Sequence, residues 1–178
     1  MRQQTDPCEE CGFVPLDHDA VDLPDSVRGL GRRYRAPLTR FLPGEDPDVI
    51  VRARPAPGTW SALEYTCHAR DVLSVFNRRV LLMVAEDRPE LGWWDHEAAA
   101  DEEAYNAQDP VEVADALDRN ARTFAETLEA VPANAWPREG VGRAGEVFTI
   151  LGAGRFVLHE GHHHLLDVGR SLRTARGR

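Results

Sequence analysis

The chain contains no lysine, and its 21 basic side chains other than histidine are all arginines. This absence excludes a Schiff-base lysine and the lysine of a phosphate-binding P-loop. The longest uninterrupted apolar run, from Val80 to Ala85, is far shorter than the ~20 residues that a membrane-spanning helix needs. The first ten residues also lack the apolar segment of a secretion signal.

Cysteine is scarce, with three residues at positions 8, 11 and 67. An odd number of cysteines without a secretion signal predicts a reducing compartment, with thiols or bound metal in place of a disulfide framework. The net charge of −9 excludes a broad basic surface for nucleic acid or anionic lipid. We therefore expect a cytoplasmic protein with no nucleic-acid partner and no membrane partner.

The strongest pattern in the sequence is the helical spacing of its apolar residues. Its 178 residues suit one domain, and apolar residues recur every three or four positions in four long segments. The expected helices start at the caps Asp25 or Ser26, Thr59 or Ser61, Asp109, and about Glu146, and they end near Phe41, Asp87, Pro132 and Arg173. No segment is a convincing strand, and the best candidate is VIVRARP, residues 49–55. These features predict an all-α helix bundle.

The expected bundle occupies only part of the chain. Residues 1–24 are rich in Pro and Asp, carry a C-x-x-C motif and predict an irregular arm, whereas residues 25–173 form the bundle and residues 174–178 a basic tail. Between the second and third helices, residues 88–109 form a long acidic connection that suits a lid or a cleft wall. Trp93 and Trp94 in this connection either plug the end of the bundle or line a substrate site.

Four of the seven histidines lie in one short window, HEGHHH, residues 159–164. His159 and His163 are four residues apart, so on a helix they share a face and can chelate one divalent ion. His162 flanks that face, whereas His164 is turned away from His163 by about 100°. The order H-E-x-x-H also occurs in zincin proteases, but no histidine occurs after residue 164 to supply a third, downstream ligand. A histidine-rich solvated helix end is the remaining alternative.

A third ligand is expected at His68, in the core-facing stripe of the second helix, where the alternative is an ordinary core histidine. Three histidines with an open coordination position are typical of a catalytic ion, with Zn²⁺ expected first and Ni²⁺, Fe²⁺ or Co²⁺ also compatible with imidazole. Glu64 and Asp167 lie one turn from expected ligands and, with His162, are candidates to hold the other ring nitrogens. Their alternative role is to solvate helix faces.

Two motifs together carry a family resemblance. W-S-x-x-E-x-x-x-H-x-x-D starts at Trp60, and F-x-L-H-E-x-H-H-x-x-x-D starts at Phe156, with Trp136 between them. Over residues 25–172 the chain resembles the DinB/YfiT-like superfamily. The resemblance implies a four-helix bundle with up-down-down-up connections and one ion held by His68, His159 and His163.

The resemblance also implies kinship with bacillithiol and mycothiol S-transferases and with mycothiol-dependent maleylpyruvate isomerases. The expected activity is therefore a metal-dependent S-transferase or isomerase that takes a small thiol, such as mycothiol, and an electrophile. Arg70, Arg155 and Arg170 are candidates to hold acidic groups of these molecules. A metal-dependent hydrolase and a non-catalytic metal-binding stress-response protein are the alternatives. The sequence identifies no catalytic residue and leaves open whether the chain forms a homodimer.

The N-terminal motif C-E-E-C-G resembles half of a zinc site. A tetrahedral ion needs four ligands, so Cys8 and Cys11 need partners, for which His18 is the first candidate and Asp17, Asp19, Asp22 or a second chain are others. A redox-active dithiol and an unligated arm are the alternatives. We expect this motif to be separate from the bundle ion, and Cys67 to be a core thiol.

Overall fold

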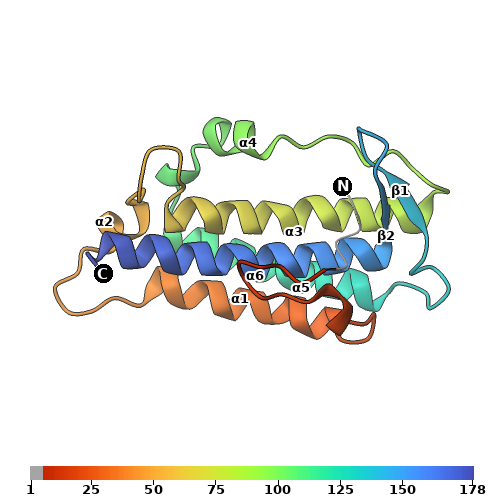
Figure 1. Ribbon diagram of the computed structural model, residues 1–178, viewed down its shortest axis with the longest axis horizontal. Coiled ribbons are helices and arrows are strands. Elements are labelled where there is room, and N and C mark those ends of the chain that lie inside the picture. The colour runs from red at the N-terminus through yellow and green to blue at the C-terminus, as the bar shows by residue number, and fades with distance from the viewer. Residues whose placement is uncertain (1–5) are drawn as a thin grey trace.

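A computed structural model describes residues 6–178, and four long helices form its main body (Figure 1). These helices are α1 (Leu23–Thr39), α3 (Ala62–Ala85), α5 (Pro110–Glu129) and α6 (Ile150–Ala175). The shorter elements are η1 (Pro15–Asp17), α2 (Pro47–Arg52), α4 (His96–Glu102), η2 (Tyr105–Ala107), β1 (Glu139–Val141) and β2 (Val147–Thr149). The expected all-α bundle is confirmed, with a small two-stranded sheet added to it.

The connections of the bundle are up-down-down-up. In Figure 1, α1 and α6 run in one direction along the bundle, and α3 and α5 run in the other. α1 and α3 each pack against both α5 and α6, and they are therefore diagonal to one another. Because α3 and α5 are parallel, the chain between them has to return along the whole bundle. This segment, residues 86–109, is called the crossover below; it passes over α3 and contains α4.

Side-chain caps fix the start of several helices. Ser61 accepts a hydrogen bond from the Glu64 backbone N–H, while the Glu64 carboxylate accepts one from the Ser61 N–H. This capping box satisfies two backbone donors at once and sets the first turn of α3. Asp109 caps α5 ahead of Pro110, as expected. α1 begins at Leu23, so Asp25 lies inside its first turn and is not its cap.

Two local features differ from what the sequence suggested. The best strand candidate, residues 49–55, overlaps the helix α2, which Asp46 caps and for whose first position Pro47 is pre-organised. The hairpin of β1 and β2 was not expected, because strands of three residues are too short for a period-two pattern to be visible. As a result α6 begins at Ile150, later than the expected Glu146.

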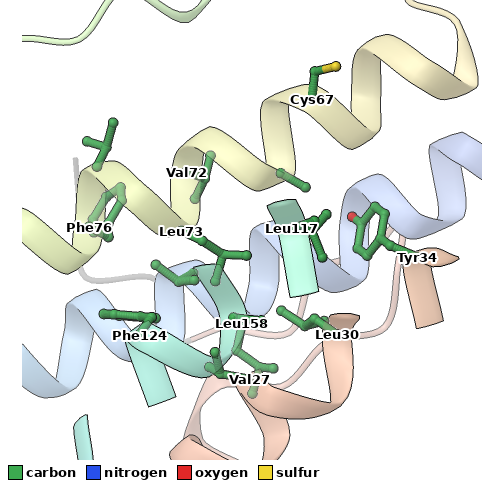
Figure 2. Packing of buried hydrophobic residues seen from close by; sticks show 14 of the residues in the cluster. Val27, Leu30, Tyr34, Cys67, Val72, Leu73, Phe76, Leu117, Phe124 and Leu158 are labelled. Carbon is green, nitrogen blue, oxygen red and sulfur yellow. The ribbon is translucent and has the colours of Figure 1, made fainter. Parts of the chain in front are cut away.

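The core lies between the four long helices (Figure 2). Leu73 of α3, Phe124 of α5 and Leu158 of α6 are each at most 2% exposed. Tyr34 of α1 is fully buried, and its hydroxyl donates to the Gly161 carbonyl oxygen of α6 at 2.8 Å. No helix within residues 6–178 combines the length and apolar character needed to cross a membrane.

Candidate metal centre

Three potential metal ligands meet between α3 and α6. His68 comes from the second turn of α3, and Glu160 and His164 come from α6, one turn apart on the face that packs against α3. A Glu160 carboxylate oxygen lies 3.5 Å from His68 Nε2 and 3.3 Å from His164 Nε2. Two imidazoles and one carboxylate are a donor set that suits Zn²⁺ or Fe²⁺. The residues present therefore fit a divalent ion.

Aromatic rings enclose this cluster. Trp94 of the crossover stacks on the His68 ring with a centroid separation of 5.6 Å and an interplanar angle of 11°, and Trp60 approaches the same ring at 5.3 Å. His68 is 5% exposed, and its Nδ1 atom is buried without a hydrogen-bond partner among the described residues. Burial lowers the pKa of His68, so the neutral form that binds metals is favoured.

A chain of charged contacts orients His164. Its Nδ1 lies 3.1 Å from Asp167, so this nitrogen carries the proton and Nε2 faces Glu160. Burial would lower the pKa of His164, but hydrogen bonds to Asp167 and Glu160 outweigh it and raise the pKa to about 9. Burial would raise the pKa of Glu160, but its hydrogen bonds to His164 and His68 hold that pKa well below the usual range. The two groups thus form a buried ion pair in the metal-free chain.

A cavity of about 520 Å³ opens beside the three side chains. Its walls come from α3, the crossover, the β1–β2 hairpin and α6. They include Trp60, Tyr65, Val72, Phe76, Arg79, Leu91, Trp93, Trp94, His96, Arg143, Phe148 and Phe156. None of the residues that line it is a serine, threonine, cysteine or lysine. The lining therefore supplies no serine, threonine or cysteine nucleophile, and water or a second substrate is a candidate for that role.

A family model of the DinB superfamily matches residues 38–168 of the chain. The chain belongs to the DinB superfamily. Among solved structures it is similar to YfiT from Bacillus subtilis, described as a probable metal-dependent hydrolase with an unusual four-helix bundle topology. The TM-score is 0.77 at 16% identity, with 89% of this chain and 87% of that chain covered. A comparison with curated proteins finds no match.

This DinB-superfamily chain does not bring His68, His159 and His163 together. His68 groups with Glu160 and His164, whereas His159 and His163 group with Cys8 and Cys11 of the N-terminal arm. The physical reason is the helix period: a step of one residue turns a side chain by about 100°, so 159 and 163 point toward the arm while 160 and 164 point toward α3. The expected triad is therefore corrected to two separate groups.

Of the three residues expected to hold the outer nitrogens of the ligands, only Asp167 contacts a histidine of the metal group. Asp167 contacts His164 as described, and its carboxylate lies 3.7 Å from His163 Nε2. Glu64 is instead committed to Arg54 and to its capping box, and His162 Nε2 lies 2.9 Å from an Arg33 nitrogen. Burial is the largest cause that lowers the pKa of His162 to about 4. Neither Glu64 nor His162 contacts the three-residue group.

Three of the substrate candidates lie away from the cavity. Arg70 pairs with Asp71, Arg155 with Asp19, and Arg170 with Asp167 and Glu10. Each is therefore already matched by a carboxylate. Trp93 and Trp94 do line the cavity, and His18 stacks on Phe13 at 4.9 Å and is not grouped with the two arm cysteines.

Sequence reasoning missed the arginines that do line the cavity. Arg79 donates to the carbonyl oxygens of Leu91 and Gly92, which fastens the start of the crossover to α3. Arg143 of the hairpin lies over the Trp93 ring at 5.6 Å. The helical period of α3 places Arg79 eleven residues, or three turns, after His68, and this spacing was the available signal. Nothing in the sequence places Arg143 there.

Proposed function

We propose that the chain is a metal-dependent enzyme, a hydrolase of small apolar substrates, with its ion on His68, Glu160 and His164. The donor set carries this proposal. Two histidines and one glutamate that leave a coordination position open are the ligands of catalytic zinc in several metallohydrolases. A divalent ion in such a site lowers the pKa of a coordinated nucleophile and polarises a carbonyl group.

The protein side chains around the group have separate tasks. Trp60 and Trp94 cover His68 and exclude bulk water, which strengthens electrostatic interactions within the site. His96 lines the same cavity, with its ring centroid 5.5 Å from that of His68, and is not one of the three ligands. We assign to His96 the transfer of a proton between the nucleophile and the leaving group.

The apolar walls define the substrate class. Phe76, Phe148 and Phe156 all line the cavity, and the Phe76 ring centroid lies 6.2 Å from that of Phe148 and 4.8 Å from that of Phe156. Cavities of a few hundred Å³ with aromatic walls and few polar groups bind compact, mainly apolar molecules. A small ester or amide with an aromatic or branched acyl group matches this space.

A thiol-dependent S-transferase is the second candidate. It is favoured by Arg143, which lines the cavity, lies over the Trp93 ring and is in none of the ion pairs found among the described residues. Such an arginine can bind an acidic group on a thiol cosubstrate. The coordinated nucleophile would then be sulfur, and the absence of serine and cysteine from the cavity lining fits this reaction equally well.

The ligand assignment is tested by elemental analysis of protein purified without a His tag. His68→Ala and His164→Ala should each remove one equivalent of metal per chain, because the site is left with two ligands. His162→Ala is the matched control on α6, since His162 is outside the group, and it should keep that equivalent. Full retention in both ligand variants would overturn the site.

The reaction is tested on chelated and metal-restored protein with aryl esters, with and without an added low-molecular-weight thiol. We expect metal-dependent hydrolysis without thiol, and His96→Ala should keep its metal and lose ~10²-fold or more in kcat. Conjugation that occurs only with thiol would replace hydrolysis by the S-transferase. Equal rates in chelated and restored protein would contradict both.

A further inference from the structure

The N-terminal arm presents a pair of thiols to α6. Cys8 and Cys11 belong to a tight turn in which the Gly12 N–H donates to the Cys8 carbonyl and the Cys8 N–H to the Phe13 carbonyl, both at 2.8 Å. Gly12 has a φ of +71°, a conformation that favours glycine. The turn thus has a specific shape that keeps both sulfur atoms on one side.

The opposite wall is a pair of histidines. Cys8 Sγ lies 3.6 Å from His163 Nδ1, and one ligand atom from each of Cys8, Cys11, His159 and His163 lies within 4.8 Å of all the others. Phe13 is 4% exposed and stacks on the His159 ring at 5.3 Å, which anchors the arm against α6. Arm and helix are therefore packed together at this group.

His159 supplies an independent sign of a missing ligand. It is 8% exposed, and both of its ring nitrogens are buried without a hydrogen-bond partner among the described residues. Buried imidazole nitrogens almost always have a partner, because a polar atom that is buried without one destabilises the fold. An ion in the group would give one of these nitrogens its partner.

The local charges are compatible with a cation. On the far side of the His163 ring, Nε2 lies 3.7 Å from Asp167 and 3.8 Å from Glu10. Carboxylates on that side favour a proton on Nε2, which leaves Nδ1 free for the ion.

We propose that Cys8, Cys11, His159 and His163 bind one Zn²⁺ ion that fastens the N-terminal arm to α6. Two thiolates and two imidazoles complete a tetrahedron and leave no position for substrate, so the site is structural. It is separate from the His68 group, which has an oxygen donor and an open cavity. The two groups lie on different faces of the same turns of α6, since Glu160 follows His159 and His164 follows His163.

The first test measures zinc by elemental analysis in untagged protein and in two double variants. Cys8→Ser/Cys11→Ser and His159→Ala/His163→Ala should each lose one zinc equivalent per chain. His18→Ala is the matched control in the arm, because His18 is outside the group, and it should keep that equivalent. Loss in His18→Ala with retention in His159→Ala/His163→Ala would overturn the ligand set.

The second test needs no arm variant. In His68→Ala/His164→Ala protein, which lacks the other group, X-ray absorption should find two sulfur neighbours at about 2.3 Å and two nitrogen neighbours at about 2.0–2.1 Å around zinc. Cobalt in the same protein should give thiolate charge-transfer bands and the intense visible bands of tetrahedral Co²⁺. Cobalt spectra without thiolate bands, or no sulfur around zinc, would overturn the proposal whatever the fate of the proposed enzyme activity.

Discussion

Cys67 differs from the two arm cysteines in its surroundings. Its side chain is fully buried, and Figure 2 shows it directed away from the labelled residues of α1 and α6. Burial raises the pKa of its thiol to about 12. In chelator-treated native protein at pH 8, we expect a thiol reagent to modify two cysteines, and the third only after unfolding in urea. Cys67→Ala should show two reactive thiols in both states, and three thiols reacting at one rate in native protein would contradict the assignment.

At the level of single residues, the metal ligands could be predicted only in part from the sequence. The window HEGHHH predicts ligands on α6, but a helix with polar residues at 159, 160, 163 and 164 offers two overlapping i,i+4 pairs. Which pair faces α3 depends on the rotation of α6 about its axis. That rotation is set by contacts such as Gly161 against Leu30 and Tyr34, which are distant in sequence.

At the scale of elements, α1 and α5 approach one another closely at Gly31. A Cβ atom on Gly31 would lie 2.8 Å from Asp118 Cα, a backbone atom that cannot move without α5. We expect Gly31→Ala to lower the free energy of unfolding by ~1–3 kcal/mol, as overpacking does, measured by urea denaturation.

Gly29 is the matched control for this prediction, because a Cβ atom there meets nothing within 4 Å. Gly29→Ala should leave stability unchanged or raise it by up to ~1 kcal/mol, since alanine favours the helix. Equal effects of the two substitutions would mean that the close approach of α1 and α5 does not limit packing.

The elements themselves were largely predictable because their signals are local. Ser61 with Glu64, and Asp109 with Pro110, mark helix starts within four residues of sequence. Residues 49–55 were the best strand candidate because a β-branched run favours a strand, but the cap at Asp46 starts a helix there. The short hairpin depends on pairing across a Gly-rich turn and on its packing under the crossover, where the Leu91 N–H donates to the Val141 carbonyl at 2.9 Å.

At the scale of the whole molecule, the parallel arrangement of α3 and α5 creates the cavity. An up-down-up-down bundle would join these helices by a short turn and leave the His68 face of α3 to solvent. Here the crossover returns over that face and brings Trp94 and His96 to His68. Periodicity predicts the helices and an unusually long connection between them, but the direction of each helix rests on contacts between distant segments. The family resemblance supplied that direction.

One ion pair joins distant parts of the molecule and gives its stability a defined pH dependence. Glu45, in the loop after α1, accepts from Arg176 Nε at 2.7 Å and from Nη2 at 2.9 Å, just beyond the end of α6. These hydrogen bonds are the largest cause that lowers the pKa of Glu45 to about 2. In unfolded chains a glutamate has a pKa of about 4.3.

Because the pKa of Glu45 is lowered in the folded state, the pair stabilises the fold above about pH 4.3 and loses its effect as pH falls toward 2. Glu45→Gln should therefore lower the urea midpoint at pH 6, and the gap to the unchanged protein should shrink as pH falls from about 4.5 toward 2. Glu102→Gln, on the exposed end of α4, is the control and should show no such gap. A gap for Glu45→Gln that stays constant over this range would mean that the carboxylate charge does not hold the loop to α6.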